Sequence, residues 1–280
     1  MRLSENQTMW NPTMEELLSW ARVIVSLMFL VYASWRDFKT REVSNNVWIV
    51  FAPVVFLLTF AQFLFFPPIG DMFQSMINYG ISFAITSIFS IALFYVGAFG
   101  GADAKALICI SLAIPLPLNF IEPLSGFVSF IFPITVFSNG VIIAALSVFY
   151  ALLRNFIWKQ RTGQKLFEGF ENESFWRKTL ALLCGYKVSV SDLKKSFLYP
   201  LEDYQKTQQG EMKRRLLLFP NDENREKIVK RIVKAKNEGK MQNTIWATPG
   251  LPMLIFITIG LILAFTVGDI VWIVLGRIFG

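Results

Sequence analysis

Apolar and polar residues follow one another along the chain in long blocks. Six blocks are apolar enough, over about 20 residues each, to cross the roughly 30 Å hydrocarbon core of a bilayer as helices. They cover residues 17–35, 46–66, 77–98, 104–121, 126–152 and 249–274. The fourth contains Pro115 and Pro117 and the fifth contains Pro133, so we expect both helices to be kinked or irregular there. The pattern predicts an all-α polytopic membrane protein with six transmembrane helices.

One large polar segment, residues 155–245, separates the fifth and sixth apolar blocks. Runs at 186–190 and 214–219 are typical of strands, and 224–237 is typical of an amphipathic helix. The apolar stripe of that helix consists of Ile228, Val229, Ile232, Val233 and Ala235. We therefore expect a small α+β domain that lies on the membrane surface.

These blocks divide the chain into three parts. Residues 1–154 form a membrane domain with helices one to five, 155–245 form a basic cytoplasmic domain, and 246–280 form the sixth transmembrane helix. The small α+β domain thus lies between helices five and six.

The basic residues are unevenly distributed. Of 27 Lys and Arg residues, 20 lie between Arg154 and Lys240. Four more, Arg36, Lys39, Arg41 and Lys105, flank two short loops, and Arg2, Arg22 and Arg277 remain. Because positive residues favour the cytoplasmic side, we expect a multi-pass protein of the cell membrane with its N-terminus outside and the large basic loop in the cytoplasm. Arg22, near the start of the first helix, is expected to extend toward the headgroups.

The net charge is +7, and the basic residues lie beside apolar spans. This indicates contact with anionic lipid rather than with nucleic acid. The chain has no histidine, so a Ser-His or Cys-His dyad and an H-E-x-x-H zinc site are excluded. Cys109 and Cys184 form no C-x-x-C pair. We expect no metal and no cofactor.

This topology places two aspartates at the same depth, and we consider them candidate catalytic residues. Asp37 lies at the cytoplasmic end of the first block, and Asp103 opens the fourth, after Gly100 and Gly101. Alone, each has a plain structural interpretation: Asp103 as a helix N-cap, Asp37 as an interfacial charge. As a pair at one depth, one carboxylate can take a proton from water while the other donates one to a scissile amide. Lys105 would steady the ionised pair or, as we favour, anchor the helix end at the headgroups.

Two other acidic residues have alternative interpretations. Glu42 pairs with Lys39 or Arg41, or meets a basic residue of a substrate. Asp269, in the last block, is an interfacial charge or marks an ion path.

The sequence S-W-R-D-F-K-T-R-E-V around Asp37 and F-G-G-A-D-A-K-A-L around Asp103 resemble the archaeal preflagellin and type IV prepilin peptidases. These are GxGD membrane aspartyl proteases. The segments F-P-I-T-V-F-S-N-G and I-W-A-T-P-G-L-P extend the resemblance. The family pattern is G-x-G-D, whereas Ala102 stands at the third position here. A small apolar residue there resembles a variant of some archaeal prepilin peptidases.

The resemblance implies that Asp37 and Asp103 are catalytic, supported by Gly100, Gly101, Ala102 and Lys105. It implies membrane-anchored pilin or flagellin precursors as substrates, such as those of the archaeal flagellum. Their short basic leader would be removed at the cytoplasmic membrane face.

Two other classes of function remain as alternatives. An ion-coupled membrane transporter would carry acids at mid-bilayer, whereas these acids are expected at one edge. A non-catalytic scaffold of a secretion system would tolerate replacement of both aspartates. Which aspartate is the base stays open, because a coupled pair titrates jointly.

Overall fold

The computed structural model describes residues 13–66, 72–194, 197–206, 212–217, 222–239 and 241–279. Its internal contacts divide the chain into two units, each with its own core. Unit 1 comprises Met1–Ala144 and Pro252–Gly280, and unit 2 comprises Ala145–Leu251. The boundaries proposed from the sequence lie after residues 154 and 245, inside elements that unit 2 contains.

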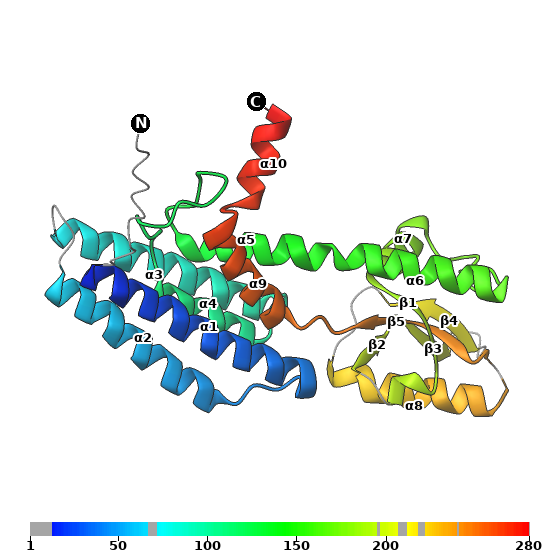
Figure 1. The fold of residues 1–280 in the computed structure, drawn as a ribbon. Helices are drawn as coiled ribbons and strands as arrows, with labels where there is room; N and C mark the ends of the chain where they lie inside the picture. Colours follow the sequence, from blue (N-terminus) through cyan, green and yellow to red (C-terminus); the bar gives the residue numbers. More distant parts are fainter. Residues whose placement is uncertain are drawn as a thin grey trace, which may run out of the picture. The chain divides into compact units, whose positions relative to one another are not determined.

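Unit 1 is helical in its described residues (Figure 1). Its helices are α1 (Met14–Thr40), α2 (Asn45–Phe65), α3 (Met72–Tyr95), α4 (Gly101–Ala113), α5 (Phe132–Ala145), α9 (Met253–Thr266) and α10 (Ile270–Phe279). A capping box, in which Thr13 and Glu16 exchange hydrogen bonds, begins α1. Buried apolar side chains of α1, α2, α4, α5 and α9 form one core, which includes Leu30, Phe51 and Ile110.

Fewer helices qualify as membrane spans than the sequence predicts. Among the described residues, α1, α2, α3 and the helix Phe132–Thr162 are long and apolar enough to cross a membrane. The last of these joins α5 to α6 (Ser147–Thr162). The pair α9 and α10, bent by 62°, adds a fifth if it is one span. The chain is therefore mostly helical with four or five candidate spans, and the six-span prediction is not confirmed.

The predicted fourth block, residues 104–121, is helical only in its first part, and the irregularity expected at Pro115 and Pro117 is confirmed. α4 ends at Ala113. Pro115 has no N–H to donate to the preceding turn, and its ring disfavours the helical conformation for the residue before it. α4 has 13 residues, which corresponds to a length of about 20 Å.

Side chains of three neighbouring helices cap the end of α4. Arg22 of α1 donates a hydrogen bond of 3.0 Å to the carbonyl of Ala113. The hydroxyls of Thr59 on α2 and Tyr79 on α3 both donate to the carbonyl of Leu112, at 2.9 and 3.2 Å. Carbonyls at a helix end inside a bundle need such partners. The expectation that Arg22 extends to the headgroups is wrong, because its side chain is buried at this helix end.

The break between α9 and α10 is held by α5. Thr135 donates to Oδ2 of Asp269 at 2.9 Å, and the amide of Asn139 donates to the carbonyl of Gly268 at 2.8 Å. Oδ1 of Asp269 also accepts from the backbone of Val271 at 3.0 Å. Asp269 is buried and acts as the N-terminal cap of α10. The two interpretations from the sequence, an interfacial charge or part of an ion path, stay predictions.

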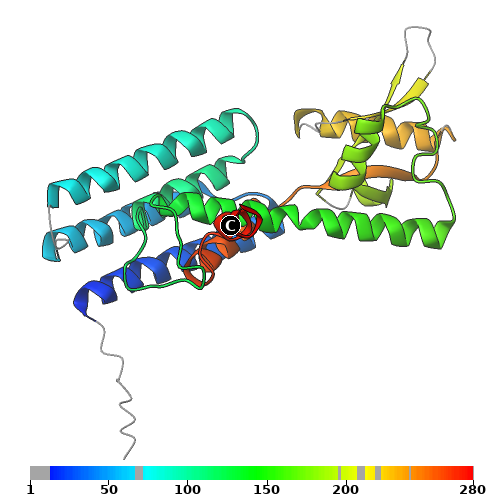
Figure 2. The ribbon, with the colours of Figure 1, turned by 90° about the horizontal axis from the view of Figure 1, so that it is seen from above.

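Unit 2 contains α6, α7 and α8 with two small sheets. Its further elements are α7 (Phe175–Cys184), β1 (Tyr186–Ser189), η1 (Asp192–Lys194), β2 (Leu198–Pro200), β3 (Glu202–Lys206), β4 (Met212–Leu216), α8 (Asp222–Asn237) and β5 (Thr244–Pro249). One antiparallel sheet has the strand order β1-β5-β2, with Tyr186 opposite Ala247, and β3 and β4 form a hairpin (Figure 2).

The two predicted strands and the predicted helix of the polar segment are largely confirmed. β1 and α8 match 186–190 and 224–237. β4 overlaps the run 214–219, of which Leu218 and Phe219 lie outside the described residues. The apolar stripe of α8, however, packs into the core of unit 2, and its central residue Ile232 is only 1% exposed. Val229 and Val233 of the stripe are only partly buried, and the location of the domain on the membrane surface stays a prediction.

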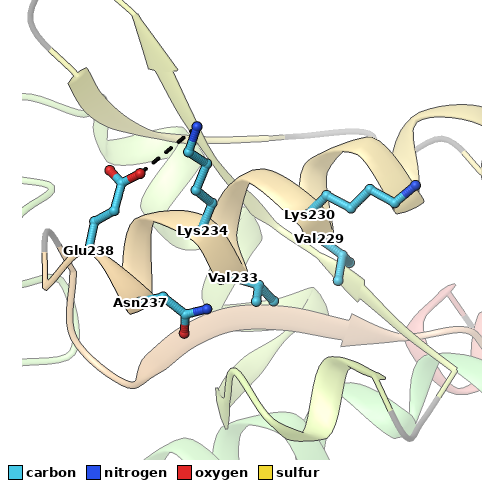
Figure 3. Close-up of a pocket in the computed structure, with 6 residues that line it drawn as sticks. All are labelled: Val229, Lys230, Val233, Lys234, Asn237 and Glu238. Atoms are coloured by element: carbon cyan, nitrogen blue, oxygen red, sulfur yellow. Dashed lines mark ion pairs between the residues drawn. The ribbon is translucent and has the colours of Figure 1, made fainter.

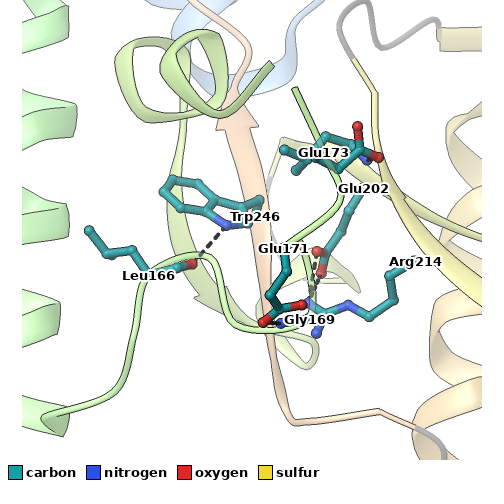
Figure 4. A network of polar contacts seen from close by, with 8 residues as sticks. Leu166, Gly169, Glu171, Glu173, Glu202, Arg214 and Trp246 are labelled. Atoms are coloured by element: carbon teal, nitrogen blue, oxygen red, sulfur yellow. Dashed lines mark hydrogen bonds and ion pairs between the residues drawn. The ribbon is translucent and has the colours of Figure 1, made fainter. Parts of the chain in front are cut away.

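A buried charged network lies at the β3–β4 hairpin (Figure 4). Arg214 donates two hydrogen bonds, of 3.0 and 2.8 Å, to the buried carboxylate of Glu202. Nearby, the Nζ atom of Lys187 lies 5.1 Å from the centre of the Trp246 ring, and the Trp246 indole donates to the carbonyl of Leu166. Burial lowers the pKa of Lys187 from 10.5 to about 8, and the negative charge of Glu202 opposes part of that shift.

Candidate active site

Asp37 lies in the last turn of α1. The helix continues beyond the end of the predicted span and reaches Thr40. It stops at Arg41, which has a left-handed backbone with φ of 57° and whose N–H donates to the carbonyl of Asp37 at 2.9 Å. This turn redirects the chain so that the residues after Arg41 face the same pocket as Asp37.

Asp103 lies in the first turn of α4. Gly100 is the N-cap of that helix, and Asp103 is its third helical residue rather than the N-cap. Oδ2 of Asp103 accepts a hydrogen bond of 3.0 Å from the backbone N–H of Gly100. The side chain is 8% exposed. A carboxylate in the first turn also interacts favourably with the positive end of the helix dipole, so two features hold Asp103 in place.

Both aspartates line one pocket of about 550 Å³. Its remaining lining residues are Arg36, Arg41, Glu42, Val43, Ser44, Asn45, Gly100, Gly101 and Ala102. The walls thus come from the end of α1, the turn to α2 and the start of α4. This volume lies in the range of small-molecule and peptide side-chain sites. The fold brings together two carboxyls that are 66 residues apart in the sequence.

The glycines and Ala102 fit the site in different ways. A Cβ atom on Gly100 would lie 3.1 Å from Oδ2 of Asp103, so a larger residue there would push on the carboxylate. A Cβ on Gly101 would meet the Phe94 ring at 3.6 Å, an ordinary contact. Ala102, which stands in place of the second glycine of the family pattern, lines the pocket and packs against the core of unit 1.

Lys105 connects α4 to α2. Its Nζ atom donates a hydrogen bond of 2.6 Å to Oδ1 of Asn45, the first residue of α2. Asn45 lines the pocket beside the aspartates. Lys105 therefore fixes the start of α4 against the pocket rim.

Sequence reasoning did not single out Ser44 and Asn45. Ser44 is the N-cap of α2, and its hydroxyl accepts from the N–H of Asn46 at 3.3 Å. A serine followed by two asparagines before an apolar block is a typical helix start, and that pattern could have located the pocket rim.

The pocket offers acid and base chemistry. Two carboxyls of different exposure, next to two arginines and backbone N–H groups, can exchange protons with bound water. In the part of the chain that the structure describes, no group of three or more His, Cys, Asp and Glu side chains is placed to hold a metal ion.

Comparisons with known proteins match both units. The pattern of the type IV leader peptidase family matches residues 24–153, which include Asp37 and Asp103. The pattern of the archaeal peptidase A24 C-terminus, type II, matches residues 177–270.

Three similar proteins are preflagellin peptidases. The protein of Methanococcus voltae is 28% identical over 255 residues, which cover 88% of this chain and 94% of the relative. That of Methanococcus maripaludis is 26% identical over 263 residues with the same coverage. That of Methanocaldococcus jannaschii is 25% identical over 262 residues, covering 88% and 93%. Together with the two matched patterns, this similarity along nearly the whole chain shows that the protein belongs to the type IV leader peptidase family.

Proposed function

We propose that the protein is a membrane aspartyl endopeptidase with Asp37 and Asp103 as its catalytic pair. The observation that carries the proposal is that both carboxyls line one pocket, at the end of α1 and the start of α4. Family membership supports leader-peptide processing. The absence of histidine from the sequence excludes the common histidine-dependent hydrolases.

The substrate class follows from the relatives. Since three similar proteins are preflagellin peptidases, the proposed substrates are membrane-anchored flagellin or type IV prepilin-like precursors with a short basic leader.

The proposed reaction is a hydrolysis by two carboxyls. The ionised carboxylate takes a proton from water, and the water oxygen attacks the scissile carbonyl carbon. The protonated carboxyl donates its proton to the amide nitrogen as the C–N bond breaks. The bond from Gly100 to Oδ2 of Asp103 orients one of the two groups.

The proposed topology keeps six crossings. The fourth would consist of α4 and the irregular segment that follows it. In support, the backbone N–H groups of Leu124 and Ser125 donate to the carbonyls of Thr266 and Val267, at the end of α9. The chain after α4 therefore reaches the end of a neighbouring helix. By the positive-inside rule the basic loops and unit 2 lie in the cytoplasm and the N-terminus lies outside, which puts Asp37 and Asp103 at the cytoplasmic membrane face.

The test follows cleavage of a tagged precursor by membranes that contain wild type, Asp37→Asn or Asp103→Asn. We expect the size shift for wild type and its loss in both variants. Glu226→Gln, an exposed acid on α8, is the matched control and should cleave normally. Cleavage by either aspartate variant at the wild-type rate would remove that residue from the mechanism.

The same variants separate the alternative functions. A scaffold would support assembly of the flagellum or pilus with both aspartates replaced, whereas the peptidase would leave uncut precursor in the membrane. A transporter would show no leader-dependent cleavage with any form.

A further inference from the structure

In unit 2, α8 presents a charged and polar outer surface. A shallow pocket of about 420 Å³ on it is lined by Val229, Lys230, Val233, Lys234, Asn237 and Glu238 (Figure 3). All six residues come from the same helix and the residue after it, and Lys234 pairs with Glu238 at 3.9 Å. With Ile228, Ile232 and Ala235 buried and Val229 and Val233 partly buried, most of the exposed surface of this helix is charged or polar, as in an element that faces water.

Helix α7, in contrast, exposes large apolar side chains. Phe175, Trp176 and Leu180 are 73%, 74% and 42% exposed. The rings of Phe175 and Trp176 contact each other edge to face, with their centres 5.8 Å apart. Large apolar side chains that gather on one exposed helix face indicate a contact with lipid or protein.

The orientation of α7 is fixed by its other side. Ala181 is buried in a core with Phe170 and Trp246. At the end of the helix, the amide of Asn155 on α6 donates to the carbonyls of Leu182 and Gly185, at 3.4 and 2.8 Å. Rotating α7 to bury Phe175 and Trp176 would break these contacts, so the exposed face is a fixed feature of unit 2.

Helix α6, against which α7 packs, ends a candidate membrane span. The span Phe132–Thr162 has 31 residues, which corresponds to about 46 Å and exceeds the roughly 30 Å apolar core. Part of the span therefore has to leave the hydrocarbon, and the exposed cations Lys159 and Arg161 in its last turns favour that end. On the same helix, Phe149, Leu153 and Phe156 are exposed. α7 is thus attached to the part of the chain that emerges from the bilayer.

We propose that α7 is an interfacial membrane anchor that inserts Phe175, Trp176 and Leu180 among the lipid headgroups of the leaflet where α6 emerges. Aromatic side chains prefer this zone, and nearby lysine and arginine residues attract anionic lipids. Arg177 and Lys178 flank the aromatic pair on the same helix, where Arg177 pairs with Glu173 at 3.2 Å. The anchor would hold unit 2 at the membrane surface through α7 rather than through α8.

The test places one fluorescent label on the full-length protein in lipid nanodiscs that contain anionic lipid. Cys109 and Cys184 are first replaced by alanine and serine, and Trp176→Cys or Leu180→Cys supplies the labelling site. Lys230→Cys on α8 is the control. Quenching is measured with nitroxide on the lipid acyl chains and with aqueous iodide. We expect several-fold stronger nitroxide quenching at 176 and 180 than at 230, and the reverse order for iodide.

Two results would overturn the proposal. Iodide quenching at 176 and 180 as strong as at 230 would mean that α7 faces water. Shielding from both quenchers would mean that another protein surface, such as a second copy of the chain, covers α7. Labels at two positions guard against a variant that fails to fold, and no readout depends on cleavage.

Discussion

The backbone N–H of Gly100 and Oδ2 of Asp103 lie 3.0 Å apart in a hydrogen bond at the start of α4. The glycine that caps the helix thus also positions the side chain that we propose as catalytic. A Cβ atom at Gly100 would lie 3.1 Å from that oxygen. The same residue thus has to cap the helix and leave room for the carboxylate of Asp103.

Replacing Gly100 by alanine should therefore impair cleavage. We expect Gly100→Ala to lower the cleavage rate by roughly tenfold, because a small displacement of a catalytic group is costly. Gly101→Ala is the matched control, since its Cβ would make only an ordinary contact with Phe94. Initial rates with a tagged precursor measure both. Equal rates for the two variants would contradict a positioning role of Gly100.

Arg22 should contribute to stability through the end of α4. Arg22→Ala removes the donor to the carbonyl of Ala113 and should lower the free energy of unfolding by about 1–3 kcal/mol. Thermal unfolding in detergent measures the effect, with Arg277→Ala as the control because Arg277 is exposed on α10. A melting temperature equal to that of the control would show that Arg22 does not support α4.

Thr135→Val tests the junction of α5, α9 and α10. The variant keeps the shape of the side chain but leaves buried Asp269 without its hydroxyl donor. We expect a loss of about 1–3 kcal/mol in unfolding free energy. Thr266→Val, which removes a bond from an exposed threonine to its own helix, should change stability much less. Equal changes in unfolding free energy for the two variants would show that the hydrogen bond between Thr135 and Asp269 does not stabilise the protein.

Lys187 gives stability a defined pH dependence. Its pKa is lowered from 10.5 to about 8 in the folded protein, so the folded state binds fewer protons than the unfolded state between these values. Stability therefore rises with pH from about 8 to 10.5, and the cost of burying the charged lysine is fully present below pH 8. That cost is about 3 kcal/mol.

The measurement compares wild type with Lys187→Met. We expect the variant to be more stable at pH 7, and the difference to shrink as pH rises from 8 to 10. Glu202 and Arg214 are present in both proteins, and their interactions with the charge of Lys187 are part of the difference that is measured. A difference in unfolding free energy that does not change with pH would contradict the lowered pKa.

The apolar pattern predicted most of the helices but not their ends. α1, α2 and α3 follow the first three blocks, and α2 continues through Pro53. α4 is shorter than its block, since the block includes residues beyond Ala113 that are apolar but follow a proline. Hydropathy measures affinity for lipid. It cannot distinguish a helix from an irregular apolar segment whose backbone carbonyls accept hydrogen bonds from neighbouring side chains.

Unit 2 shows a second limit of the pattern. The boundary predicted after residue 245 lies inside β5, Thr244–Pro249, so the predicted part 246–280 includes most of this strand together with the last apolar span. In the structure Ile245, Trp246 and Ala247 are buried at the centre of the sheet. A short buried strand and the start of an apolar helix have the same local composition, and only the long-range pairing with β1 and β2 distinguishes them.

The pocket could be anticipated only in part. The motifs around Asp37 and Asp103 singled out two acids, and the structure places both at one pocket. The contributions of Ser44 and Asn45 depend on the turn at Arg41, whose left-handed backbone gives no strong signal in the sequence because arginine rarely adopts it. Whether the two acids are catalytic stays a prediction that the cleavage experiments test.

The capped end of α4 limits how its other end can move. Arg22, Thr59 and Tyr79 bind the carbonyls of its last turn from three different helices, whereas the turn that carries Asp103 follows a flexible glycine-containing link that includes Gly97, with φ of 78°. Sliding α4 along its axis would break several hydrogen bonds at once. Movement of α4 alone could therefore change the separation of Asp103 and Asp37 only by a tilt about its Ala113 end, which is a rotation rather than a translation.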